Sequence, residues 1–318
     1  MIKLRVFISV LTLMSSIAGI AGQQNVPKNL PYPNSPTVTA LEAVKHVYYV
    51  NQFYAFNEFP VENQIKGMNI VVNKDRWGRV YTQAVERHIN TTYSLDHAIK
   101  KQEIAIWRNG KHKSMGMLIT DYSDDAKNRS YQIWVPTLRK VRRFAQPIMK
   151  DSWGGTDFTW GDVSLRKPFH ETHEILAQTT FESCLDAIKI PEDKRNKWTA
   201  NIPGPSCHPQ GRPVYKLKST PQYDADYDYR ISYVDAQNFA DYRIEYYKKG
   251  NVFKVIDKDW HSLDIDGDPR GAYWSYWYGR NYETGHESLA LLLWDGMKYD
   301  SQGDEKFWSS ATLRKLHR

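Results

Sequence analysis

The chain has 318 residues, of which 41% are hydrophobic and 25% charged, and its formal net charge is +7. This charge is modest for so long a chain, whereas nucleic-acid-binding domains concentrate Lys and Arg on one face or in recognisable motifs. We therefore expect no nucleic-acid partner, and a chain long enough to bury the core of one large β domain or of two small ones.

Residues 1–22 have the three parts of an export signal. Lys3 and Arg5 precede an apolar stretch over residues 6–14, and small residues follow it, which is the order of a cleavable signal peptide. A membrane anchor is the alternative, but Ser and Thr interrupt the stretch before it reaches the roughly 18 apolar residues that a spanning helix needs. Gln23 stands where a lipidated cysteine would have to be. We expect an exported, periplasmic protein whose signal is cleaved and which is not lipidated.

A proline-rich leader over residues 23–38 separates this signal from a single domain that we expect to span residues 39–318. The leader carries four prolines and no periodicity, which predicts an extended or disordered arm. Beyond it, apolar residues recur at helical spacing behind Thr39, a residue suited to cap a helix. We expect one amphipathic helix that ends before Pro60.

Beyond Gly67, short runs of alternating apolar and polar residues are separated by turn signals. This spacing predicts a mainly β fold with a large antiparallel sheet or open barrel. A short helix is expected from Phe307 to Leu316. The clearest candidate strands cover residues 68–72, 103–107, 114–120, 131–135, 213–218, 229–234, 242–247 and 252–256.

The densest group of aromatic residues is the run AYWSYWY at residues 272–278. Successive side chains of a regular strand point to opposite faces. Alternation then places Tyr273, Ser275 and Trp277 on one face, and Trp274, Tyr276 and Tyr278 on the other. One of these faces could line an apolar cavity, and ordinary core packing explains the run equally well.

Only two cysteines occur, Cys184 and Cys207, and both lie in the part that we expect to be exported. An oxidising compartment permits a disulfide between them. The bridge would tie down the Pro- and Gly-rich stretch over residues 202–213 and stabilise the fold by about 3 kcal/mol in the chain-entropy model. Two separate buried thiols are the alternative.

No catalytic or metal-binding motif is complete. His170 and His173 are three positions apart, whereas the histidines of a zinc-protease helix are four apart. Asp264–Asp268 begins like a calcium loop but lacks the glycine and glutamate that an EF-hand needs at its sixth and twelfth positions. Ser164–Lys167 fits Ser-x-x-Lys without its companion motifs. We therefore expect no metal, no cofactor and no enzymatic activity.

The most informative segment lies between residues 131 and 162. It contains WVP at 134–136, LRKVRR at 138–143 and GTDFTWGD at 155–162. This combination resembles the bacterial outer-membrane lipoprotein-sorting protein family, whose members are similar to the periplasmic lipoprotein carrier LolA but longer. Further segments agree in order, namely VYKLKSTP at 214–221, YYKKGNVFKVID at 246–257, TGHES at 284–288 and YDSQGDEKF at 299–307.

The resemblance implies a strongly curved antiparallel sheet, an incomplete LolA/LolB-like barrel with helices over its open side and an apolar cavity between them. Such a cavity shelters acyl chains from water. The implied function is therefore to bind a lipid or a lipoprotein and transfer it toward the outer membrane, without a cofactor. Implied partners are an RND-type inner-membrane transporter, an outer-membrane acceptor and, transiently, the membrane. The cargo stays open among lipoprotein, sterol-like lipid, hopanoid and phospholipid.

Aromatic side chains on such a curved sheet are the candidates for lining the cavity. Alternation puts apolar residues on one face of many strands, and a sheet this large cannot fill its own interior unless helices cover it. The four candidate cavity residues are Trp134, Phe158, Trp160 and Trp277.

A basic segment follows the candidate strand at 131–135, and its members are Arg139, Lys140, Arg142 and Arg143. Alternation puts these charges on both faces, so neither face of the segment can be buried as a whole. It could be an edge strand that charge protects from aggregation, or a basic rim that meets lipid head groups or an acidic partner. Alternatively, its arginines pair with Asp157 and Asp162 and hold the turn at Gly154 and Gly155 in one unit near the cavity mouth.

Two other functions stay open. The first is a hydrolase or another enzyme in a β scaffold that uses Asp157 and Asp162 as its carboxylates. The second is an accessory subunit of an exporter that binds only protein.

Overall fold

The computed structural model describes residues 26–35, 37–58, 68–93, 97–263, 265–292 and 305–316. The predicted export signal over residues 1–22 lies outside these residues. Among the helices of the described part, none is long and apolar enough to cross a membrane.

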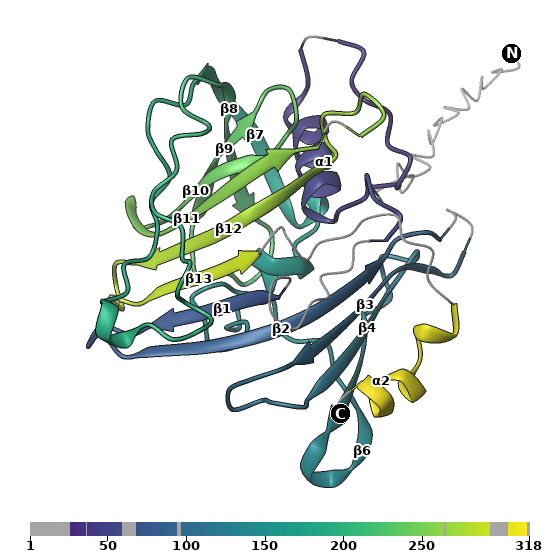
Figure 1. Ribbon diagram of the computed structural model, residues 1–318. Helices are drawn as coiled ribbons and strands as arrows, with labels where there is room; N and C mark the ends of the chain where they lie inside the picture. The colour runs from purple at the N-terminus through teal and green to yellow at the C-terminus, as the bar shows by residue number, and fades with distance from the viewer. Residues whose placement is uncertain are drawn as a thin grey trace, which may run out of the picture.

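In the part of the chain that the structure describes, thirteen strands form one antiparallel sheet, in the order β6-β5-β4-β3-β2-β1-β13-β12-β11-β10-β9-β8-β7. Strands β1–β6 make one meander and β7–β13 a second, and pairing of β1 with β13 joins the two. Because β6 and β7 lie at opposite ends of the order, the curved sheet is not closed (Figure 1). The predicted open antiparallel sheet is confirmed, and each candidate strand overlaps an observed one. The strands are β1 Asn69–Lys74, β2 Val80–Asn90, β3 Ile99–Trp107, β4 Gly116–Tyr122, β5 Ser130–Val135, β6 Lys140–Phe144, β7 Glu171–Thr180, β8 Pro213–Pro221, β9 Tyr229–Asp235, β10 Asp241–Lys248, β11 Asn251–Ser262, β12 Ala272–Asn281 and β13 Glu287–Leu292.

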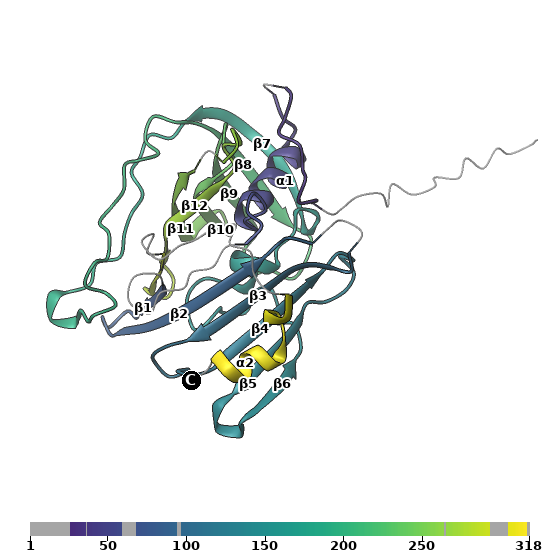
Figure 2. The ribbon, with the colours of Figure 1, turned by 45° about the vertical axis from the view of Figure 1, so that its right-hand side comes forward.

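Helix α1, Ala40–Asn51, lies on the concave side of the sheet beside β7 (Figure 2). Its first turn is closed by a capping box, in which the Thr39 side chain accepts from the Glu42 N–H at 3.3 Å and the Glu42 carboxylate accepts from the Thr39 N–H at 2.8 Å. At its other end, Asn51 Nδ2 donates to Asp241 of β10 at 3.0 Å. The predicted helix and its cap are confirmed, although Leu41 faces solvent and does not belong to the buried face.

Helix α2, Ser310–Leu316, packs on the convex side of the sheet, next to β4 and β5 (Figure 2). Its Leu313 is fully buried in a small apolar cluster with Ile104, Leu118 and Trp134. The predicted C-terminal helix is thus present, but it covers the outside of the sheet and leaves the interior to α1 and to a loop.

A long loop over residues 181–212 covers the convex side of the second meander. The disulfide between Cys184 and Cys207 lies in it, with Cα atoms 4.2 Å apart, which confirms the predicted bridge. The loop is fixed to β11 because the Asp186 N–H donates to the Asp257 carboxylate at 2.7 Å and the Ser206 hydroxyl donates to Asp259 at 2.9 Å.

The connection from β6 to β7 has to travel from one edge of the sheet to the other. It does so across the concave face, as residues 145–170, and includes the short π-helix Gly161–Leu165. Phe158 in this crossing segment is fully buried. The most specific motif of the sequence, GTDFTWGD, is therefore the part of the chain that divides the interior of the half-barrel.

The described part of the proline-rich leader packs against the sheet. Val26 is 2% exposed and belongs to the main core. The Tyr32 hydroxyl donates to the carbonyl of Gln237 at 2.7 Å, and its ring lies 6.1 Å from that of Phe239. These contacts place the leader over the turn between β9 and β10.

Candidate functional site: a cavity on the concave face

The crossing segment and the first meander enclose an elongated cavity of about 240 Å³. Strands β1 to β4 supply one wall, the crossing segment and β12 supply the opposite wall, and the end of α1 closes one end. Most of the lining is apolar. It is made of Phe53, Val71, Val85, Ala105, Trp107, Met115, Met117, Ile119, Trp153, Phe158, Trp160, Val163, Trp274, Trp277 and Ala290, with the polar residues described below.

The aromatic wall depends on an irregularity that alternation cannot show. The pairing of β11 with β12 shifts register between Asp259 and Trp260, leaving Ser275 as an extra residue. The bulge brings Trp274 and Trp277 to the same concave face, with ring centroids 5.5 Å apart. The prediction that these two residues face opposite ways was therefore wrong, because one extra residue reverses the alternation that follows it.

Phe158 closes this wall against the sheet. Its ring meets Trp277 edge to face, with centroids 6.0 Å apart. It also lies directly over Gly279 of β12, where an added Cβ would come within 2.7 Å of the Phe158 ring. A side chain at position 279 would push Phe158 away, so glycine is required there for the crossing segment to approach the sheet.

Charged side chains gather at the end of the cavity next to α1. The Arg87 guanidinium donates to the Glu103 carboxylate at 2.7 Å, and Lys101 Nζ donates to Gln52 Oε1 at 3.0 Å. Burial lowers the pKa of Lys101 to about 8, although the neighbouring Glu103 carboxylate opposes the shift. This end of the cavity is polar. Its three charged residues are two cations, Arg87 and Lys101, and one anion, Glu103.

The opposite end of the cavity opens toward the surface. There Trp107 Nε1 donates to Gln83 Oε1 at 3.0 Å, and Gln83 Nε2 donates to the carbonyl of Gly154 at 3.1 Å. Gly154 and Gly155 both have positive φ, +60° and +79°, in the region that glycine adopts without steric cost. The predicted glycine turn therefore exists, and its carbonyl ties the crossing segment to β2.

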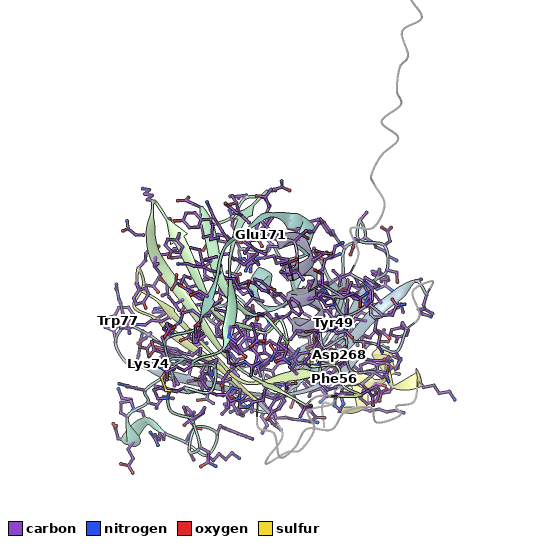
Figure 3. All side chains as sticks on the ribbon, turned by 90° about the horizontal axis from the view of Figure 1, so that it is seen from above. Tyr49, Phe56, Lys74, Trp77, Glu171 and Asp268 are labelled. Atoms are coloured by element: carbon purple, nitrogen blue, oxygen red, sulfur yellow. A yellow bond between two sulfur atoms is a disulfide. The ribbon has the colours of Figure 1, made fainter. Side chains whose placement is uncertain are left out.

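A surface hollow of about 680 Å³ continues this opening, since Gln83, His112 and Gly154 line both spaces. The hollow is bordered by the β1–β2 turn, where Trp77 is 64% exposed. Lys74 and Trp77 lie on the side of the molecule away from Tyr49, in the last turn of α1, and from Phe56, which follows the helix (Figure 3). The cavity thus runs across the half-barrel, from this mouth to α1.

A network of buried ion pairs lies on the concave face of the second meander, beside α1. Asp162 accepts from Lys254 at 2.9 Å, from Arg166 at 2.8 Å and from the Tyr246 hydroxyl. Although burial alone would raise it, the pKa of the Asp162 carboxyl is held well below its usual range by these two cations. A space of about 60 Å³ lies beside this network.

A second anion, Glu171, extends the same network. It accepts from Arg230 in a bidentate pair with a shortest distance of 2.6 Å, and from the Tyr227 hydroxyl at 2.9 Å. Burial opposes ionisation of Glu171, but Arg230 and Arg166 lower its pKa to about 2. The two halves of the interior therefore differ in kind, since one is an apolar cavity and the other a packed ionic core.

Three of the four candidate cavity residues, Phe158, Trp160 and Trp277, line the cavity. Trp134 does not. It lies on the convex face of β5, in the cluster under α2. That prediction is corrected because alternation gives the period of a strand but does not say which face is inside.

The basic segment leads into β6, an edge strand of the sheet. This is the position that the first of the three explanations, a charged edge strand, predicts. The side chains of Arg139, Lys140, Arg142 and Arg143 are all exposed to solvent.

The predicted pairing of this basic segment with the glycine-turn loop is wrong. Among the described residues, no ion pair joins it to Asp157 or Asp162, because Asp162 pairs with Arg166 and Lys254 in the interior and Asp157 accepts from Ser288.

The two carboxylates of the hydrolase alternative face different spaces. Asp162 borders the small space in the ionic core, whereas Asp157 borders the surface hollow and accepts from the Ser288 hydroxyl at 3.3 Å. Asp162 is ionised and neutralised by two cations, so it is unsuited to donate a proton. The geometry does not bring these residues together as a catalytic pair.

Several cavity residues were not predicted from the sequence. Asn69, Arg87, Lys101 and Glu103 line the cavity, yet they belong to strands whose polar positions look like solvent-facing ones. Only the direction in which the sheet curves shows that these polar positions face inside, and the sequence pattern does not give that direction.

Comparisons with known proteins concern the fold. A family model described only as "Uncharacterized protein" matches residues 100–202, and a search of curated proteins gives no match. The structure is similar to that of a domain from Vibrio parahaemolyticus described as an outer membrane lipoprotein-sorting protein domain, with a TM-score of 0.60 and 12% identity over 86% of this chain and 98% of that chain. It is equally similar to a DUF1329 family protein from Desulfovibrio piger, with a TM-score of 0.60 and 12% identity over 87% of this chain and 100% of that one. A LolA superfamily protein from Nitrosomonas europaea gives a TM-score of 0.46 at 11% identity, over 87% of this chain and 100% of that one. The likeness to the first two structures confirms, for the fold alone, the resemblance seen in the sequence motifs.

Proposed function

We propose that this protein is a carrier that holds the acyl chain of a lipid or lipoprotein in the cavity between the first meander and the crossing segment. The observation that carries the proposal is the cavity itself. It is elongated, about 240 Å³ in volume and lined mostly by apolar side chains. Its volume is close to the lower end of the range of about 300–1,000 Å³ typical of small-ligand pockets, which suits one acyl chain better than several.

The length of the cavity also suits a chain-like cargo. Along β3 the lining runs from Lys101 to Trp107, six residue steps that span about 20 Å at the rise of an extended strand. Each methylene that leaves water for this space contributes about 0.8 kcal/mol. A long acyl chain therefore gains enough free energy to bind without any covalent chemistry.

The proposed cellular role is to carry this cargo between the inner and outer membranes. We place the carrier in the periplasm, between an RND-type inner-membrane transporter and an outer-membrane acceptor, with transient contact to the membrane. The likeness of the fold to the Vibrio domain, whose description refers to lipoprotein sorting, supports this choice of cargo.

The exposed basic edge of β6 is the proposed docking rim for lipid head groups or an acidic partner. Exchange of Arg142 for Glu should slow transfer of cargo to anionic vesicles, most clearly at low salt where exposed charges are least screened. Lys249, which is exposed in the β10–β11 turn on the other meander, provides a matched Lys249→Glu control that should leave the rate unchanged. Equal rates for both variants and the wild type would exclude β6 as the rim.

The binding proposal is tested with a series of alkyl compounds that differ only in chain length, competing with a fluorescent acyl probe. Affinity should rise about fourfold for each added methylene, the equivalent of about 0.8 kcal/mol, and should level off once the chain fills the cavity. Affinity that does not depend on chain length, or no binding at any length, would contradict a carrier function.

A further inference from the structure

The side-chain amide of Asn69, in the cavity wall, forms no hydrogen bond with the described residues. Asn69 of β1 is 3% exposed and lines the cavity. Neither its Oδ1 nor its Nδ2 has a hydrogen-bond partner among the described residues. Buried polar groups are nearly always paired, because an unpaired one has lost its contact with water without replacement. An amide in this state needs an explanation.

A second unpaired group lines the same space. Trp277 is 6% exposed, and its indole Nε1 also lacks a partner within the described part of the chain. The sheet register places Trp277 opposite Ala290 and Ala290 opposite Val71, one inward-facing position from Asn69 on β1. The wall near the mouth therefore offers two kinds of donor and one acceptor that the protein leaves unused.

Four other polar lining residues differ from these two. Gln83 is bonded through both ends of its amide, and Arg87 and Glu103 are paired with each other. Lys101 is bonded to Gln52. Among the fully buried polar atoms of the cavity lining, those without a partner in the described residues thus belong to Asn69 and Trp277, on the mouth side of the cavity.

We propose that Asn69 and Trp277 form a subsite for a hydroxyl group of the cargo, so that the preferred cargo is a hydroxylated lipid. The inference rests on the proposed carrier function. A hydroxyl has one donor and two acceptor positions, so it can donate to Asn69 Oδ1 while accepting from Asn69 Nδ2 or from Trp277 Nε1. An ester or ether oxygen only accepts and leaves Oδ1 unpaired, and a carboxylate has no proton to donate.

Position within the cavity gives this subsite an orientation. Asn69 lies one inward-facing residue beyond Val71, whose partner Gln83 borders the mouth. The hydroxyl would therefore lie just inside the mouth, and the apolar chain would extend past Ala105 and Met117 as far as the charged residues that end the apolar part of the cavity.

The test compares dodecanol with its isomer methyl undecyl ether, which has the same atoms but no hydroxyl proton. Wild-type protein should bind dodecanol about tenfold more tightly than the ether. Asn69→Leu keeps a side chain of similar size and removes the amide, so it should bind both compounds equally, with dodecanol weakened about tenfold and the ether unaffected. Chemical denaturation of the same variant should show a stability equal to or above that of the wild type, since an unpaired amide is removed from the core.

Asn73→Leu is the matched control. Asn73 lies on the same face of β1 but borders the surface hollow, where it accepts from Ser288, so this variant should keep the tenfold preference. Equal binding of the two isomers by the wild type, or a preference that survives in Asn69→Leu, would overturn the subsite while leaving the carrier function intact. Binding of neither compound by the folded wild type would overturn the carrier function, and the subsite with it.

Discussion

A larger side chain on β3, in the wall of the cavity, is the most direct perturbation of the proposed carrier. Ala105 on β3 points into the cavity, is 6% exposed, and pairs with Arg87 on one side and Met117 on the other. Ala105→Phe would project a phenyl ring into the middle of the space without touching the ionic core of the second meander. The variant should fold, because the ring occupies a cavity and does not overpack a filled core.

The expected loss of binding follows from the methylenes that the ring displaces. If the ring excludes about four of them, the loss at about 0.8 kcal/mol each is about 3 kcal/mol, which weakens binding roughly 200-fold. The free energy of unfolding of Ala105→Phe should equal that of the wild type or exceed it by about 0.5–2 kcal/mol, as for other cavity-filling changes.

Two assays on the same preparation separate these effects. Displacement of a fluorescent acyl probe measures affinity, and urea denaturation measures the free energy of unfolding. Ala177→Phe is the control, since it makes the same exchange at an exposed position of the edge strand β7. Folded Ala105→Phe that binds acyl chains as tightly as the wild type would refute the assignment of the cargo to this cavity.

Three further predictions concern stability. Because burial lowers the pKa of Lys101 from 10.5 to about 8, the unfolded chain binds more protons there between these pH values, and stability should rise with pH across that window; urea midpoints should show the rise in the wild type and a smaller one in Lys101→Met. Replacing Cys184 and Cys207 together by Ser should lower the free energy of unfolding by about 3 kcal/mol but leave acyl binding per folded molecule unchanged, because their loop lies on the convex face; reduced binding at full folding would contradict this placement. Asp162→Asn should cost about 3–5 kcal/mol in chemical denaturation, since two buried cations lose their anion, whereas Asp157→Asn should cost under about 1 kcal/mol, and similar losses for both would argue against the ionic core.

The strands were predictable because side chains alternate between the two faces of a strand and turn signals separate the strands. The same rule explains the error at Trp134. A sheet covered on both sides, by α1 and the crossing segment inside and by α2 and a long loop outside, has apolar residues on both faces, so alternation cannot identify the interior. Only the curvature of the sheet decides this, and curvature depends on contacts between distant strands.

The interior chemistry was less predictable. Asp162 is bonded to Arg166, four residues away, which the sequence could have suggested, but also to Lys254, which is far away in the sequence. The bulge at Ser275 could not be predicted from the sequence either, since a regular and a bulged strand have the same composition. The pairing register of strands therefore determines which side chains form the cavity wall. Local sequence patterns do not reveal this register.

Native mass spectrometry of the protein recovered from a bacterial periplasm tests the central claim most directly. We expect the wild type to carry a co-purified species of lipid-like mass, released on denaturation, and Ala105→Phe prepared in the same way to lack it. Wild-type protein free of any such species, or the same species in equal amount on Ala105→Phe, would contradict the claim that this cavity carries an acyl chain.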